Sequence, residues 1–285
     1  MHLFITGTSG RVGSAIVADV LAHGHTVVAT DQVPPRTSVE APAGAYRFVQ
    51  MELDNVDALK AAMDGCEGLI HMAAIPHPRQ HPDEFVFNNN MSACFNAFQA
   101  ASLLDIRKVV AASSLSALGT VWAEPPFLPL YVPIDEKHPL LPHDCYSLSK
   151  GLAEDIGHMF HRRTGMQVAM MRFPWVVQPA EFPEMATRVA ANLAEYAPHL
   201  WTYVDVRDAA TGCRQAIEHD GLGFDVFDIT AADTIAERPT MDLMAEFAPN
   251  VEVRARLKGN DSVFTCERAA KAFGYAPQWS WRQSA

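Results

Sequence analysis

The sequence has no run of lysine and arginine, and its formal net charge at pH 7 is −11. A surface of this sign repels the phosphates of nucleic acids and of anionic membranes. The sequence also lacks any uninterrupted apolar stretch of about 18 residues, the length needed to span a bilayer. Its first residues lack the charged segment, apolar core and cleavage site of a signal peptide. We therefore expect a cytoplasmic protein with a small-molecule partner, and neither nucleic acid nor a membrane.

Paired cysteines are missing as well. The five cysteines are odd in number, widely spaced and without a CxxC pair, which argues against a disulfide framework and a zinc site. Close histidine pairs occur, but none has a cysteine or carboxylate nearby at a recognised ligand spacing. The sequence therefore predicts free thiols and no metal.

Short β-rich runs alternate with helix-length segments along most of the chain, the pattern of a parallel sheet covered by helices. The expected strands are 2–7, 26–31, 46–51, 68–74, 108–114, 167–173 and 224–230. The Pro-rich segment 120–145 is expected to be a loop, because proline fixes φ and removes backbone donors. The predicted fold is α/β, a doubly wound parallel sheet with a smaller C-terminal lobe.

The first chemical motif is TGTSGRVG at 6–13, between an expected strand and an expected helix. Gly7, Gly10 and Gly13 allow a tight turn that brings backbone amides and a helix N-terminus against a pyrophosphate. Asp31 ends the next expected strand, where a carboxylate binds a ribose diol and repels a 2′-phosphate. The motif therefore predicts a dinucleotide site that prefers NAD to NADP.

A second motif is YSLSK at 146–150, about thirty residues after AASSLSALG at 111–119. A tyrosine and a lysine four residues apart share one face of a helix, so both can reach one ligand. Taken together with HMAA at 71–74 and the glycine motif, the sequence resembles the extended short-chain dehydrogenases/reductases, specifically the NAD-dependent epimerase/dehydratase family. The likeness extends over nearly the whole chain.

The resemblance implies a Rossmann domain over 1–173 that binds NAD, and a substrate lobe over 174–285 from which 202–230 returns to the sheet. It also implies a homodimer formed through the helices at about 84–104 and 146–163. These statements are expectations about the fold and its assembly.

The resemblance further implies the roles of the catalytic residues. Tyr146 would be the base, and the ammonium of Lys150 would favour its phenolate and hold the nicotinamide ribose. Ser114 would orient the substrate oxygen, with Ser116 facing the substrate, and Asn90 would lie near the reacting centre. The alternatives are a capping serine and a half-buried core tyrosine.

Other cofactor contacts carry over from the same family. They are expected at the end of the fourth strand, beside the adenine, and where backbone amides meet the pyrophosphate: Met72, Ala73, Ala74, Asp54, Asn55, Arg11 and Val12. The first three could instead be plain core residues, and Asp54 or Asn55 could cap the following helix.

Two features bear on the substrate. Only about twenty residues separate MRFPWVVQP from TYVDVRD, too few for the segment with which nucleotide-sugar epimerases cover a nucleotide diphosphate. Trp175 would offer an aromatic wall to a sugar ring, or be a core residue. The compact length resembles the family's uronate dehydrogenases, which need a cation for the carboxylate. The candidates are Arg172, Arg188, Arg207 and His77.

The sequence thus predicts an NAD-dependent oxidoreductase acting on a secondary alcohol or lactol of a sugar, sugar acid or related polyol. An epimerase or dehydratase that retains its NAD is the first alternative, and a non-catalytic NAD-binding regulator is the second. The Pro-rich loop 120–145 is expected to act as a lid, a dimer contact or an inert excursion.

Overall fold

The computed structural model of the chain describes residues 1–283 and has a parallel β-sheet at its centre. The sheet has seven strands in the order β10-β7-β5-β4-β1-β2-β3, and all six pairings are parallel. The strands are β1 (His2–Thr6), β2 (Thr26–Asp31), β3 (Tyr46–Gln50), β4 (Gly68–His71), β5 (Lys108–Ala112), β7 (Gln167–Arg172) and β10 (Phe224–Asp228). The predicted fold class, a doubly wound α/β sheet, is confirmed.

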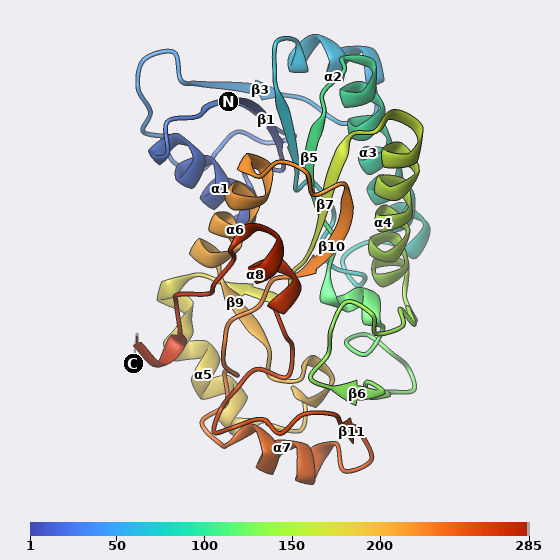
Figure 1. Cartoon of the computed structure of the whole chain (residues 1–285), viewed down its shortest axis with the longest axis vertical. Coiled ribbons are helices and arrows are strands. Elements are labelled where there is room, and N and C mark those ends of the chain that lie inside the picture. The colour runs from blue at the N-terminus through green and yellow to red at the C-terminus, as the bar shows by residue number, and fades with distance from the viewer. Residues whose placement is uncertain (284–285) are drawn as a thin grey trace.

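Helices cover both faces of this sheet (Figure 1). One face packs against α1 (Arg11–Ala22), α6 (Val206–Glu218) and α8 (Glu267–Phe273). The other face packs against α2 (Val56–Met63), α3 (Asp83–Leu103) and α4 (Cys145–Thr164). The sheet is therefore buried on both sides, which explains why its strands are apolar runs with little alternation of polar residues.

The first strand illustrates how the sequence divides between the two layers. Successive side chains of a strand point to opposite faces, so Leu3 and Ile5 join the core beneath α1 and α6. Phe4 joins the other core, beneath α2 and α3. All three side chains are fully buried, and each layer therefore gains apolar contacts from the same short strand.

A third core lies below the carboxyl ends of the strands and holds the smaller lobe together. The lobe contains α5 (Phe182–Ala191), α7 (Thr240–Phe247) and the paired strands β8 (Trp175–Val177) and β9 (Tyr203–Asp205). Short 3-10 helices complete the chain at η1 (Leu115–Leu118), η2 (Pro179–Glu181), η3 (Ala197–His199) and η4 (Trp281–Gln283). Within 202–230, α6 and β10 rejoin the main layers, whereas β9 pairs with β8 and not with the central sheet.

The Pro-rich loop packs against this lobe. Its strand β6 (Tyr131–Val132) pairs with β11 (Glu252–Val253), and an isolated bridge joins Ile134 to Phe264. Val132 and Ile134 are fully buried, so the second half of the loop is anchored in the core of the lobe.

Two other findings concern the whole described chain. Within residues 1–283, no helix is both long enough and apolar enough to cross a membrane. The five cysteines are free thiols, and the described residues contain no cluster of three metal-ligating side chains.

Candidate active site

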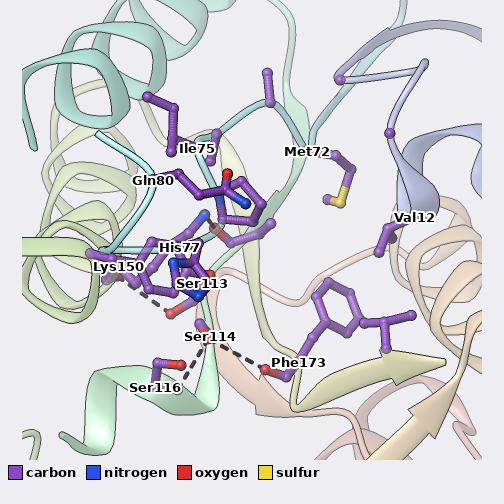
Figure 2. A pocket seen from close by; sticks show the side chains of 18 of the residues that line it. Val12, Met72, Ile75, His77, Gln80, Ser113, Ser114, Ser116, Lys150 and Phe173 are labelled. Carbon is purple, nitrogen blue, oxygen red and sulfur yellow. Dashed lines mark hydrogen bonds between the residues drawn. The ribbon is translucent and has the colours of Figure 1, made fainter. Parts of the chain in front are cut away.

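A cavity of about 1670 Å³ lies at the carboxyl ends of the central strands and continues into the smaller lobe. Its nucleotide half is lined by the loops after β1, β2 and β4, and its substrate half by the loop after β5 and by the lobe. Ser114 and Lys150 lie where the two halves meet, with His77 and Phe173 nearby (Figure 2). In doubly wound sheets this edge is where ligands bind.

The glycine loop has the shape that a pyrophosphate requires. Gly7 has a φ of +72°, and a side chain there would bring a Cβ within 2.7 Å of the Ala73 backbone nitrogen. A Cβ on Gly13 would lie 2.1 Å from the Gly7 carbonyl oxygen. The first turn of α1 begins at Gly10 with no side-chain cap, so its amides are available to an anion. These residues fit the diphosphate of a dinucleotide.

Asp31 ends β2 at the edge of this loop. Its carboxylate accepts a hydrogen bond from the backbone N–H of Ser9 at 3.0 Å and thereby ties the glycine loop to the second strand. Asp31 also lines the cavity. The remaining lone pairs of its carboxylate can accept hydrogen bonds from the hydroxyls of a ribose.

The other residues expected to contact the cofactor divide into two groups. Those that line the cavity are Arg11, Val12, Asp54, Met72, Ala73 and Ala74. The guanidinium of Arg11 binds Glu181 and the carbonyl of Val176, so its side chain ties α1 to the lobe. Asn55 is not a lining residue; its side chain caps α2 by accepting a hydrogen bond from the Ala58 N–H at 3.0 Å. For Asn55 the structure therefore supports the alternative role, that of a helix cap.

The serine, tyrosine and lysine of the second motif come together in the cavity, all three of them buried. The Ser114 hydroxyl accepts a hydrogen bond from the Ser116 N–H at 3.0 Å and starts η1. Tyr146 lies in the first turn of α4, which Asp144 caps by accepting from the Ser147 N–H at 2.8 Å. Capping fixes where α4 starts and hence where Tyr146 points.

Lys150 lies one turn further along α4. Its ammonium donates a hydrogen bond to the Ala112 carbonyl at 3.0 Å and lies 5.8 Å from the centre of the Tyr146 ring. Burial lowers the pKa of Lys150 to about 8. The lysine is therefore poised to lose its proton only slightly above neutral pH.

The pKa of Tyr146 is shifted upward, whereas that of Lys150 is shifted downward. Burial raises the pKa of its hydroxyl to about 12, and a side-chain hydrogen bond with Ser114 partly opposes this rise. In the protein chain alone, Ser114 and not Lys150 is the side chain that lowers the pKa of Tyr146. The phenol is therefore protonated at neutral pH until further positive charge reaches it.

Asn90 does not line the cavity. Its side-chain oxygen accepts a hydrogen bond from the Ile75 N–H at 2.8 Å, and its nitrogen donates to the Ile75 carbonyl at 3.1 Å and to Ser149 at 3.2 Å. Asn90 thus holds the loop after β4 against α4. A role for Asn90 in the reaction remains a prediction. Such a role would be indirect, through the position of this loop, because Asn90 does not contact the cavity.

Two of the arginines expected to bind a substrate carboxylate are already paired. Arg172 is buried and donates two hydrogen bonds of 2.8 Å to Glu154, which also accepts one from Ser113 at 2.6 Å. Arg207 forms two hydrogen bonds with Asp205 and packs on the Trp279 ring. Neither arginine lines the cavity, so the structure supports a structural ion pair for each of them.

The substrate half contains four predicted residues, namely Ser116, His77, Trp175 and Arg188. The lining also includes Trp122, which belongs to the Pro-rich loop for which a lid was one of the expected roles. Tyr196 and His199 line the cavity as well and were not predicted. Tyr196 and His199 gave no signal, because η3 brings them to the cavity only after the lobe has folded.

Residues 3–229 match the NAD dependent epimerase/dehydratase family, so the chain belongs to that family and the predicted resemblance is confirmed. The prediction of NAD as cofactor agrees with this membership.

Individual relatives are more distant. The chain is 28% identical over 185 residues to a putative UDP-glucose 4-epimerase of Methanocaldococcus jannaschii, a match that covers 64% of this chain and 58% of the relative. It is 27% identical over 222 residues to an L-arabinose 1-dehydrogenase (NAD(P)(+)) of Haloferax volcanii, a match that covers 76% of this chain and 82% of the relative.

Among solved structures, a mutated uronate dehydrogenase superposes with a TM-score of 0.70 at 22% identity, covering 99% of this chain and 84% of that one. This similarity is one of fold.

Proposed function

We propose that the protein is an NAD-dependent dehydrogenase that oxidises a secondary alcohol or lactol of a sugar, sugar acid or related polyol. The observation that carries the proposal is the burial of Ser114, Tyr146 and Lys150 together where the nucleotide and substrate halves of one cavity meet. A protein that only binds NAD has no need of these three groups at that place.

The residues divide the chemistry between them. NAD, when held by the glycine loop and Asp31, would supply the acceptor for the hydride that leaves the carbinol carbon. Tyr146, as its phenolate, takes the proton of the same hydroxyl, so that a carbonyl forms. With NAD bound, the oxidised nicotinamide would add the positive charge that favours the phenolate, Lys150 would hold the nicotinamide ribose, and Ser114 would donate a hydrogen bond to the reacting oxygen. The lysine, with its pKa near 8, can pass the proton onward to solvent.

An epimerase is the second candidate, and the similarity to a putative UDP-glucose 4-epimerase favours it. In that reaction the hydride returns to the same substrate, so the same three residues would serve. The segment between β8 and β9, only 178–202, argues against it because it offers little chain to cover a nucleotide diphosphate.

We also propose a cytoplasmic homodimer. Free thiols suit a reducing compartment. The adjacent helices α3 and α4 expose Phe85, Phe95, Leu103 and Leu148. A second copy would cover such side chains, and light scattering should then give twice the mass of one chain. A mass of one chain would refute the dimer.

The experiment for the activity is the absorbance of NADH when purified protein and NAD meet a panel of aldoses, uronates, polyols and nucleotide-linked sugars. Tyr146→Phe should lower kcat/KM by about 10²–10⁴ while leaving NAD binding intact. Tyr46→Phe, on β3 and outside the cavity, is the matched control and should stay active. Release of NAD only on denaturation, with no NADH formed, would instead favour an epimerase or dehydratase.

A further inference from the structure

The substrate half of the cavity is bounded by rings from four separate segments: the loop after β4, the Pro-rich loop, β8 and the turn around η3. Trp175 and Tyr196 stack with ring centres 5.9 Å apart and an angle of 5° between their planes. Trp122 meets His77 edge-on at 4.6 Å and His199 at 6.2 Å. We call these five residues the aromatic wall. Such a surface favours contact with the C–H faces of a flat ring.

The two imidazoles in the wall are hydrogen-bonding groups. Nδ1 of His77 accepts a hydrogen bond from the backbone N–H of Arg79 at 2.9 Å, which leaves Nε2 for a ligand. Burial lowers the pKa of His199 to about 4, so its ring is neutral at pH 7. Each ring can therefore exchange hydrogen bonds with a hydroxyl.

Trp122 supplies a further polar group. Its indole N–H is shielded from water and has no hydrogen-bond partner within residues 1–283. An unsatisfied buried donor destabilises the structure by about 1–3 kcal/mol, which a ligand oxygen would relieve. The wall therefore suits a hydroxylated ring better than a purely apolar one.

Cations near the substrate half are already occupied or lie at its edge. Arg172 and Arg207 are bound to Glu154 and Asp205 and lie outside the cavity lining. Arg188 lines the cavity, but its side chain is 50% exposed and is bonded to Glu184. His81 lines it too, and it is also exposed.

Arg11 lines the cavity but is bound to Glu181, and Arg79 lies over the Trp122 ring at 5.3 Å but is ion-paired with Glu124. The ammonium of Lys150 is held by the Ala112 carbonyl at the reacting centre. A substrate carboxylate at the wall would thus lose water without gaining an unpaired cation as its partner. Transferring an unpaired carboxylate out of water is strongly unfavourable, whereas hydroxyls need only neutral partners.

We propose that the substrate is an uncharged sugar whose ring packs on the aromatic wall and whose hydroxyls bind His77 and His199, and that the corresponding sugar acid is a poor substrate. This inference rests on the proposed dehydrogenase function and chooses between the substrate classes that it leaves open.

The test compares pairs that differ only at C6: galactose with galacturonate, and glucose with glucuronate. The expected result is a kcat/KM at least tenfold higher for the neutral member of a pair. A uronate turned over as well as its neutral partner, or better, would overturn the inference while leaving the dehydrogenase intact.

A binding measurement separates the inference from the activity. Calorimetry with NAD-loaded Tyr146→Phe protein should detect the neutral sugars and give at least tenfold weaker binding of the acids. If no sugar forms NADH yet this order of binding holds, the proposed activity fails and the inference stands. If no sugar binds, or if the acids bind as tightly, the inference fails.

Two variants locate the preference. Trp122→Ala should raise KM for the neutral sugar about tenfold with a much smaller change in kcat, because stacking acts on binding. Arg188→Ala should leave the preference for the neutral sugar in place. Selective loss of uronate turnover in Arg188→Ala, from a wild type that prefers uronates, would place the substrate carboxylate at that arginine and refute the inference.

Discussion

Replacing Lys150 by methionine should inactivate the protein and also stabilise it. Burial lowers the pKa of Lys150 from its ordinary 10.5 to about 8, so the fold disfavours the charged ammonium. A change of one pKa unit corresponds to about 1.4 kcal/mol, which gives a penalty of roughly 3 kcal/mol at pH 7. Losing the hydrogen bond to the Ala112 carbonyl offsets about 1 kcal/mol of the gain. The net prediction is a free energy of unfolding about 2 kcal/mol higher at pH 7.

The difference in free energy of unfolding between Lys150→Met and the wild type should depend on pH. Below pH 8 the lysine is protonated in both the folded and unfolded states, and the fold bears the whole penalty. Between pH 8 and 10.5 the folded state releases the proton before the unfolded chain does, so wild-type stability contributed by this group rises. The advantage of Lys150→Met should therefore shrink as pH rises and reverse by about 1 kcal/mol near pH 10.5, where only the lost hydrogen bond remains.

The assay is urea unfolding followed by far-UV circular dichroism, without NAD, at pH 7, 9 and 10.5. Burial lowers the pKa of His71 to about 3 and raises that of Cys94 to about 12, and the charge of Lys150 lowers both. Both pKa values lie outside the range tested, so the difference between the variants reports Lys150. Lys60→Met, at a partly exposed site on α2, is the control and should change stability by less than about 0.5 kcal/mol. A Lys150→Met protein that is less stable at pH 7, or a difference independent of pH, would refute the reasoning.

Three further changes test other parts of the structure. Glu154→Ala leaves the buried guanidinium of Arg172 without its partner and should lower the free energy of unfolding by about 3–5 kcal/mol in urea titrations. Glu154→Gln should lose less stability, and an unchanged unfolding midpoint for Glu154→Ala would contradict the prediction. Asp31→Ala should lower the NAD-to-NADP ratio of kcat/KM about tenfold or more, and an unaltered ratio would remove Asp31 from the ribose site. Gly13→Ala, whose Cβ would lie 2.1 Å from the Gly7 carbonyl oxygen, should abolish NADH binding by fluorescence, whereas Gly151→Ala, with its nearest neighbour at 3.5 Å, should retain it.

Much of the nucleotide half was predictable because its signals are local. The seven expected strands each overlap a strand of the central sheet, and the inner ones are short apolar runs that both layers of helices bury. The glycine loop and Asp31 are encoded within thirty residues, and a tight turn after β1 leaves few other arrangements. The place of Lys150 beside Tyr146 follows from the spacing of four along one helix.

The substrate half was less predictable because its contacts join segments far apart in the chain. Arg172 was a reasonable cation for a carboxylate until the fold placed Glu154 against it from α4. No local pattern indicates that pairing, since the residues lie on different elements and only burial of both makes the ion pair. Tyr196 and His199 reach the cavity through packing of the lobe, which spacing along the sequence does not encode.

The construction of the aromatic wall has a consequence for redesigning the protein. Its rings come from the loop after β4, the Pro-rich loop, β8 and the turn around η3, and the Pro-rich loop is itself joined to the lobe through β6 and β11. Exchanging one of these segments for that of a relative would leave the other three shaped for the original ligand. Effects of substitutions at Trp122 and His199, whose rings touch, should therefore be non-additive. A new substrate range would require that the four segments be transplanted together, while the NAD half is left as it is.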